Sequence, residues 1–278
     1  MTTLRNRLLG LTASLLLLTG FMGTRLPAQT TQPAPADGQR IVTIAAAADL
    51  KCACADLAAA FAKDHPVIKL QITYGSSGNF YTQLTQQAPF DLFLSADIDY
   101  PNKLSAQGLA IKESEFVYAQ GRLVLWVPAA SKLDLEKAGL EVLKDPAILK
   151  IAIANPRHAP YGRAAEAALK KLDVYDDIKD KLVLGDNIAQ TAQFVESGAV
   201  DIGLIALSLA VAPAMKDKGR YKLVPPDCYP KLEQAGIILN WAQDKPATQA
   251  LAAFLKSAPG QEILKRYGFT LPQSEPRP

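Results

Sequence analysis

Four short segments rich in small and hydroxyl residues have the composition of anion-binding sites. They are residues 46–49 (Ala-Ala-Ala-Asp), 75–79 (Gly-Ser-Ser-Gly-Asn), 155–162 (Asn-Pro-Arg-His-Ala-Pro-Tyr-Gly) and 185–188 (Gly-Asp-Asn-Ile). Each lies between an apolar run and a segment with helical spacing. The first N–H groups of a helix lack intrahelical partners and lie at the positive end of its dipole. Several such junctions around one cleft would bind an oxyanion without a lysine or arginine.

The segments around these junctions alternate between strand and helix periodicities. Branched apolar runs predict strands at 41–45, 68–74, 91–95, 121–127, 148–154, 181–184, 200–205, 221–224 and 236–239. Helical spacing predicts helices behind Asp49 and at 79–87, 97–104, 161–172, 188–197, 207–216, 246–256 and 260–267. Such alternation indicates the α/β class, with mostly parallel sheets flanked by helices.

The positions of the junctions predict two lobes that face each other. Two junctions fall before residue 80 and two after residue 155. Open α/β sheets bind ligands at the carboxyl ends of their strands, so facing lobes would bring both pairs to one crevice. We expect lobe 1 to hold residues 41–120 and 232–278 and lobe 2 to hold 121–231, joined by two extended crossings near 118–121 and 231–236.

Residues 1–40 predict a secretory signal peptide and a disordered leader. Arg5 and Arg7 precede an apolar stretch, and a Thr/Gln/Pro/Ala tract follows it. An uncleaved membrane anchor is the alternative. This region holds four of the chain's 30 basic residues and one of its 27 acidic residues, so the rest is formally neutral. Neutrality argues against nucleic acid or an anionic membrane as a partner.

Three cysteines in an exported chain cannot all form disulfides. We interpret Cys52, Cys54 and Cys228 as small buried apolar residues. His65 and His158 could complete a metal site with Cys52 and Cys54, but no pattern of metal ligands supports one.

Through five motifs, the chain resembles the periplasmic molybdate-binding proteins of ABC importers. The motifs are Ala-Ala-Ala-Asp-Leu, Gly-Ser-Ser-Gly, Asp-Leu-Phe-Leu-Ser-Ala-Asp, Asn-Pro-Arg-His-Ala-Pro-Tyr-Gly and the late Lys-Arg-Tyr-Gly-Phe, in collinear order over about 41–272. The resemblance implies a type II periplasmic-binding fold, whose two lobes close over molybdate or tungstate. It also implies a monomer in the periplasm that needs no cofactor, catalyses no reaction and delivers its ligand to a permease with its ATPase.

Transferred by position, the resemblance implies a set of oxyanion ligands in this sequence. Many relatives have a serine hydroxyl in the first segment, and it is absent here. A tyrosine that some relatives place at the position of Ala206 is also absent, and Tyr161 looks like its substitute. The main-chain N–H of Ile188 would donate. The implied ligand set is Ala48, Asp49, Ser76, Ser77, Tyr161 and Ile188.

Asp49 allows two interpretations, because a carboxylate would repel a dianion. As a helix N-cap it would accept hydrogen bonds from the N–H of Lys51 or Cys52, leaving its own N–H for the anion. Alternatively, it could accept the proton of an anion such as hydrogen phosphate. Sulfate and molybdate have no proton to offer at neutral pH.

Three alternatives remain open at this point. Another tetrahedral oxyanion such as phosphate or sulfate could be the ligand. Ser77 and His158 could belong to a serine hydrolase, although the Gly-x-Ser-x-Gly motif is missing. Ser76 and Ser77 could simply cap the following helix. We expect Arg157, His158 and Arg163 at a solvated rim.

Overall fold

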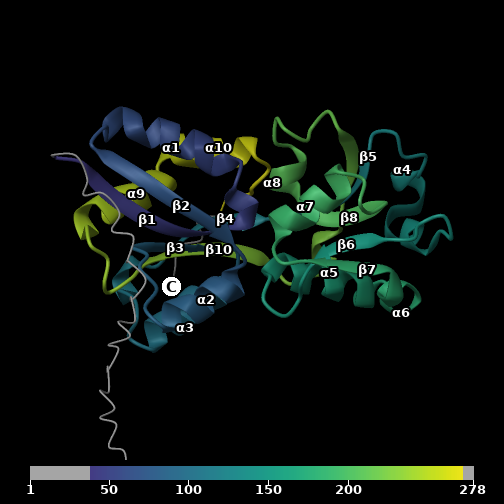
Figure 1. The fold of residues 1–278 in the computed structure, drawn as a ribbon, viewed down its shortest axis with the longest axis horizontal. Helices are drawn as coiled ribbons and strands as arrows, with labels where there is room; N and C mark the ends of the chain where they lie inside the picture. Colours follow the sequence, from purple (N-terminus) through teal and green to yellow (C-terminus); the bar gives the residue numbers. More distant parts are fainter. Residues whose placement is uncertain (1–37, 272–278) are drawn as a thin grey trace, which may run out of the picture. The chain divides into compact units, whose positions relative to one another are not determined.

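The structure is a computed structural model that describes residues 38–271. The predicted signal peptide lies almost wholly outside the described residues. Within them, no helix is long and apolar enough to cross a membrane. The described chain forms two five-stranded sheets with helices packed against them, which confirms the α/β two-lobe fold (Figure 1).

The first sheet has the strand order β2-β1-β3-β10-β4. Its central strand β3 (Leu92–Ser95) pairs in parallel with β1 (Arg40–Ala47), which pairs in parallel with β2 (Ile68–Gly75). On the other side β10 (Leu232–Ile238) is antiparallel to β3 and to β4 (Phe116–Gly121). The prediction of mostly parallel sheets therefore holds for only half of this sheet.

The second sheet repeats this mixed arrangement in the order β7-β6-β8-β5-β9. Strand β6 (Ile151–Ala154) is parallel to β7 (Leu182–Gly185) and β8 (Ile202–Ala206). Strand β5 (Leu123–Pro128) is antiparallel to β8 and to β9 (Gly219–Leu223). The parallel half is the half that carries strand-to-helix junctions.

Five helices cover the first sheet. On one face, α1 (Ala53–Asp64), α9 (Lys245–Lys256) and α10 (Ala258–Arg266) share an apolar core with the sheet. On the other, α2 (Ser77–Thr85) and α3 (Asp99–Ala106) supply Phe80, Leu84 and Leu104 to a second core (Figure 1). The last two helices thus return to the first sheet, as the sequence predicts.

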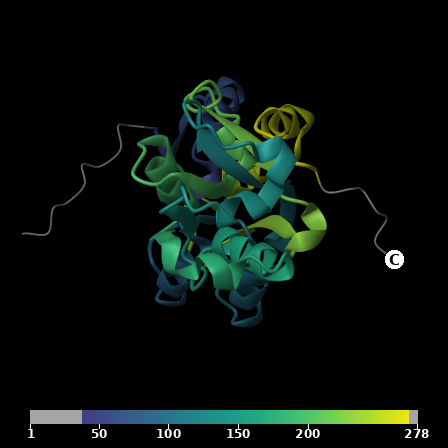
Figure 2. The same cartoon turned by 90° about the vertical axis from the view of Figure 1, so that its right-hand side faces the viewer.

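One large core holds the second sheet and its helices together. Figure 2 shows the molecule from the end that carries this sheet. The main helices here are α5 (Pro160–Lys171) and α7 (Ile188–Glu196), with the short α4 (Leu135–Ala138), α6 (Tyr175–Ile178) and α8 (Leu207–Ala210). The sequence predicts helix over 207–216, but α8 ends at Ala210. Pro213 explains this end, because proline lacks an N–H and disfavours helix before it. Five short 3-10 helices complete the described chain: η1 (Ala48–Leu50), η2 (Lys112–Ser114), η3 (Gly139–Lys144), η4 (Lys179–Lys181) and η5 (Pro226–Cys228).

The chain passes between the two sheets at two places. Strand β4 leads into β5 through Arg122, and β9 leads into β10 through η5. The two predicted crossings near 118–121 and 231–236 are β4 and β10, which pair with each other (Leu232 with Gly121). Because each of these strands also continues the first sheet, the connections between the lobes start from a rigid base.

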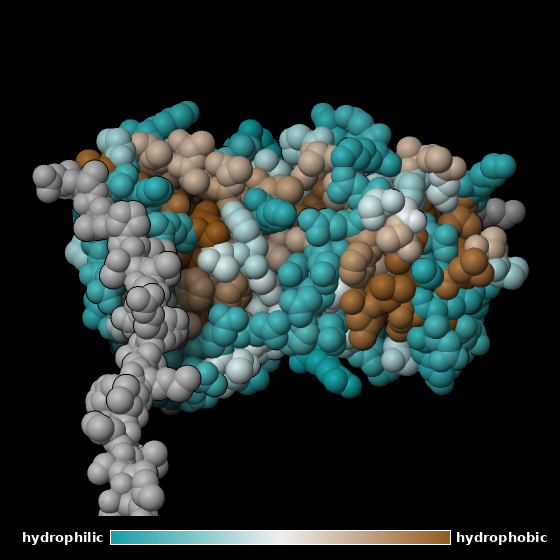
Figure 3. All heavy atoms as spheres, in the orientation of Figure 1, coloured by the Kyte–Doolittle hydropathy of each residue, from teal (hydrophilic) through white to brown (hydrophobic). Residues whose placement is uncertain are grey.

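The cysteines are free, and Cys54 and Cys228 are buried as predicted, whereas Cys52 is half-buried. Residues 38–271 contain no group of His, Cys, Asp and Glu side chains suited to a metal ion. Apolar surface gathers on the half of the molecule that holds the second sheet (Figure 3). The large exposed apolar residues of that half are Leu149, Leu184, Tyr221 and Leu223.

Candidate functional site

The four strand-to-helix junctions meet at one small cavity. Strand β1 leads into η1, β2 into α2, β6 into α5, and β7 into α7. The cavity is lined by all six residues expected from the sequence, Ala48, Asp49, Ser76, Ser77, Tyr161 and Ile188, together with Ala47, Gly75, Ala96, Ala159 and Pro160. Residues from both lobes therefore surround the same space.

The cavity is small. Its volume is about 10 Å³. It has room for one compact group and not for a sugar, an amino acid or an ester substrate. No lysine, arginine or histidine is among the described residues that line it.

Main-chain N–H groups supply the positive potential of this cavity. Ala48 begins η1, Ser77 begins α2, Tyr161 lies in the first turn of α5, and Ile188 begins α7. Residues in the first turn of a helix have no carbonyl group one turn earlier, so these N–H groups have no partner within their own helix. They lie where helix dipoles favour negative charge. Gly78 differs, because its N–H already donates to the carbonyl oxygen of His158 at 2.9 Å.

Ser77 has a hydroxyl hydrogen left for a ligand. The helix begins at Ser77, two residues earlier than predicted, and the side chain is fully buried. Its hydroxyl oxygen accepts a hydrogen bond from the N–H of Ala96 at 3.0 Å. Neither Ser76 nor Ser77 caps the helix through its side chain. The capping alternative for these two residues is therefore wrong.

Asp49 is fully buried, and its carboxyl group contacts the side chains of Tyr161 and Gln234. Its Oδ2 accepts hydrogen bonds from the Tyr161 hydroxyl at 3.0 Å and from the Gln234 amide nitrogen. Its Oδ1 has no hydrogen-bond partner. The N-cap interpretation is wrong, because Ala47 occupies the N-cap position and the N–H of Lys51 donates to Ala48.

Burial raises the pKa of the Asp49 carboxyl from its ordinary value of 3.8 to about 6, although the hydrogen bonds from Gln234 and Tyr161 act in the opposite direction. Burial also raises the pKa of Tyr161 well above its ordinary value, so this hydroxyl keeps its proton and donates it to Asp49. The Tyr161 hydroxyl is thus used inside the protein, which leaves the N–H of Tyr161, in the first turn of α5, as the donor for a ligand.

Gln234 is a site residue that the sequence does not reveal. It lies on β10, is fully buried, and contacts both Asp49 and the Tyr161 hydroxyl. Tyr118 on β4 donates to the Gln234 amide oxygen at 3.0 Å, which turns the amide nitrogen toward Asp49. The only sequence signal is a glutamine in the segment that leads into the apolar run 236–239.

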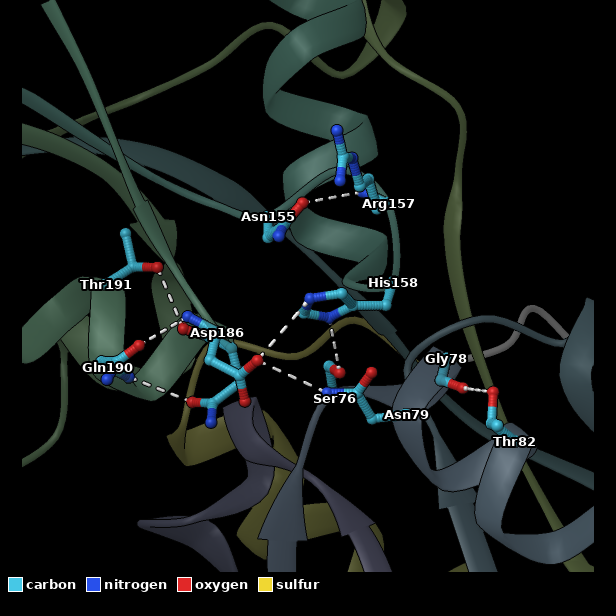
Figure 4. Close-up of polar contacts among 11 residues, drawn as sticks. Ser76, Gly78, Asn79, Thr82, Asn155, Arg157, His158, Asp186, Gln190 and Thr191 are labelled. Atoms are coloured by element: carbon cyan, nitrogen blue, oxygen red, sulfur yellow. Dashed lines mark hydrogen bonds and ion pairs between the residues drawn. The ribbon is translucent and has the colours of Figure 1, made fainter. Parts of the chain in front are cut away.

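Polar contacts join the two lobes beside Ser76, which lines the cavity (Figure 4). His158 Nδ1 lies 2.9 Å from the Ser76 hydroxyl. Its Nε2 lies 3.6 Å from a carboxylate oxygen of Asp186 in the same lobe, and that oxygen accepts from the Asn79 side chain of the other lobe at 3.5 Å. Arg163 pairs with Asp97 and donates to the Tyr100 hydroxyl at 3.0 Å. His158 and Arg163 therefore connect the lobes at the rim.

The hydrolase alternative pairs Ser77 with His158, and this pairing is absent. His158 contacts Ser76 instead, whereas the Ser77 hydroxyl contacts Ala96. Arg157 donates its N–H to the Asn155 side chain and does not line the cavity.

Comparison with known proteins places the chain in a family. Residues 42–270 match the family model of bacterial extracellular solute-binding proteins. The molybdate-binding protein ModA of Azotobacter vinelandii is 40% identical over 232 residues, which are 83% of this chain and 90% of that protein. ModA of Rhodobacter capsulatus is 39% identical over 196 residues, 70% of this chain and 75% of its own.

A solved structure agrees with these sequence matches. The periplasmic molybdate-binding protein of Azotobacter vinelandii superposes with a TM-score of 0.79 at 32% sequence identity, over 84% of this chain and all of that one. The fold, the cavity between two lobes and the relatives lead to the same conclusion: the chain belongs to the family of bacterial extracellular solute-binding proteins.

Proposed function

We propose that this protein captures molybdate or tungstate in the cavity between its lobes and delivers the anion to an ABC importer. The main observation behind this proposal is the convergence of four helix N-termini, from both lobes, on one small cavity. The molybdate-binding relatives support the choice of ligand. The anion would contact Ala48, Asp49, Ser76, Ser77, Tyr161 and Ile188.

The location of the protein, its lobes and its partners are part of the same proposal. Residues 1–40 would direct export to the periplasm, where the protein acts as a monomer without a cofactor and without catalysing a reaction. Lobe 1 would hold residues 41–120 and 232–278, and lobe 2 would hold 121–231. After closing on the anion, both lobes would dock on a permease with a cytoplasmic ATPase.

Size and charge give the expected selectivity. Molybdate, tungstate and sulfate carry the same charge, so a neutral cage of N–H donors distinguishes them by how well each fills the cavity. The larger molybdate and tungstate would reach donors on both lobes, whereas sulfate would leave some of them unpaired.

An anion titration by calorimetry tests this proposal. Molybdate and tungstate should bind with a dissociation constant of about 1 µM or below, equivalent to ~8 kcal/mol. Sulfate should bind at least tenfold more weakly. Absence of heat with both molybdate and tungstate would end the proposal.

Phosphate is the second candidate, and one observation favours it. The unpartnered Oδ1 of Asp49 could accept the proton of hydrogen phosphate. Asp49→Asn separates the two ligands, because an amide oxygen is a weaker hydrogen-bond acceptor than a carboxylate and the amide NH₂ can only donate. A phosphate site would lose affinity with this variant, whereas a molybdate site would keep or gain it.

A further inference from the structure

Asp49 places a carboxyl group inside a cavity suited to a dianion, and its two oxygens differ. Oδ2 accepts from Tyr161 and Gln234, whereas Oδ1 has no partner among the described residues, and the side chain is fully buried. A buried polar atom without a partner is costly unless a ligand or water satisfies it. Since Asp49 itself lines the cavity, an anion bound there is the partner that the site can offer.

The hydrogen-bond pattern determines where a proton on Asp49 would reside. Oδ2 already accepts hydrogen bonds from Tyr161 and Gln234, so a proton on Oδ2 would face the hydrogens of these two donors. Oδ1 is free, and a carboxylic acid protonated there becomes a donor. An ionised Oδ1 would instead present negative charge to the ligand.

We infer that the protein takes up one proton when it binds its dianion, and that this proton lies between Oδ1 of Asp49 and a ligand oxygen. This inference rests on the proposed function. The proton comes from solvent: ionised Asp49, the dianion and one H⁺ give a complex with one O–H···O bond. No other bond forms or breaks. Asp49 thus acts as a hydrogen-bond donor that replaces the serine hydroxyl of the resembled family's first segment.

The surroundings make Asp49 the group that changes protonation. The titratable groups packed around it in the described part of the chain are Cys54 from α1, Tyr118 from β4 and Tyr161 from α5. Burial raises the pKa of Cys54 to about 12 and the pKa values of Tyr118 and Tyr161 well above their ordinary value. These three groups keep their protons at neutral pH. Gln234, the other partner, is neutral.

The direction of the pH effect follows from linkage. In the free protein burial holds the pKa of Asp49 at about 6, so the carboxyl is mostly ionised above pH 6. A dianion beside it favours the protonated form further. Affinity is therefore constant below about pH 5 and falls about tenfold per pH unit well above pH 6, or about 100-fold between pH 5 and pH 8.

Calorimetry with molybdate measures the proton directly. The titration is repeated at pH 7.5 in two buffers with different heats of ionisation, and the slope of the observed heat gives the protons taken up. The expected value is close to one proton per anion at pH 7.5 and close to zero at pH 5.

Three variants complete the experiment. Asp49→Asn imitates the protonated acid, because its amide can place NH₂ where Oδ1 lies; it should take up no proton and bind molybdate about 100-fold tighter than the unaltered protein at pH 8. Asp56→Asn removes a carboxylate on α1 that contacts Tyr267, and His158→Gln removes the histidine at the rim. Both should still take up one proton.

The outcomes separate the two proposals. If the unaltered protein binds molybdate without proton uptake and with the same affinity at pH 5 and pH 8, the proton inference is wrong and the proposed function stands. Uptake that persists in Asp49→Asn but disappears in His158→Gln also overturns it. If neither the unaltered protein nor any variant binds molybdate at any pH, the proposed function itself has failed.

Discussion

The imidazole Nδ1 of His158 lies 2.9 Å from the hydroxyl of Ser76, although 82 residues separate them and they belong to different lobes (Figure 4). This contact can form only when the lobes are together. It stands beside the cavity that both lobes line. The rim contacts therefore belong to the closed state and should influence how fast a ligand leaves.

Ser76→Ala should speed ligand release. Loss of one hydrogen bond between the lobes, worth about 1 kcal/mol, predicts an increase in the dissociation rate of about fivefold. Stopped-flow fluorescence after dilution or competition measures it. Ser114→Ala is the matched control, because that hydroxyl accepts from the N–H of Ile238 within lobe 1. If both variants release the ligand equally fast, the contact at the rim has no special role.

Gly78→Ala should hinder closure. A Cβ on Gly78 would lie 2.6 Å from the carbonyl oxygen of His158 and 2.8 Å from the Tyr100 hydroxyl. The lobes would have to move apart, so molybdate affinity should fall about tenfold or more, equivalent to ~1.4 kcal/mol. Gly203→Ala is the control, because its Cβ would meet neighbours at 3.4 Å. Unchanged affinity in Gly78→Ala would show that this close approach is not needed for binding.

Asp49 should destabilise the ligand-free protein at neutral pH. Burial raises its pKa from 3.8 to about 6, so the folded state holds this proton more tightly than the unfolded state. Its contribution to the free energy of unfolding therefore falls as pH rises from about 4 to 6, by ~3 kcal/mol in all. Asp49→Asn removes this loss.

Urea unfolding of the ligand-free protein checks this. Asp49→Asn should be more stable than the unaltered protein by up to ~3 kcal/mol at pH 7.5, and the gain should be much smaller at pH 4.5. A gain of the same size at both pH values would contradict the assignment. Asp56→Asn, at a partly exposed carboxylate, should show no such pH-dependent gain.

Gln234→Leu should shift the pH dependence of binding upward. The amide of Gln234 donates to Asp49 and lowers the pKa of this carboxyl. Without that donor, the pH at which affinity begins to fall should rise by about one unit, because a hydrogen bond to a charged group is worth ~1.5 kcal/mol or more. Affinities measured from pH 5 to pH 9 test the shift. Tyr118→Phe, which only loosens the amide's orientation, should shift it less.

Short sequence patterns are sufficient to predict the four strand-to-helix junctions. The four junctions were predictable because small residues, hydroxyls and Pro160 mark strand ends and helix starts within a few positions. Strand pairing is different: β10 joins the first sheet antiparallel between β3 and β4, and periodicity alone carries no information about direction.

The partners of Asp49 lie beyond such local patterns. Tyr161 is 112 residues away and Gln234 is 185 residues away, so only the folded chain brings them together. The N-cap interpretation was reasonable for an aspartate before a helix. It is wrong because the Tyr161 hydroxyl and the Gln234 amide both donate to the Asp49 carboxylate, which therefore does not cap the helix.

The most direct test of the central claim is a crystal structure of the protein with molybdate, with the molybdenum located by anomalous scattering. The account predicts one molybdenum in the cavity, its oxygens within hydrogen-bond distance of the N–H groups of Ser77 and Tyr161 and of Oδ1 of Asp49. Molybdenum bound elsewhere, or a cavity that stays empty at saturating molybdate, would contradict it.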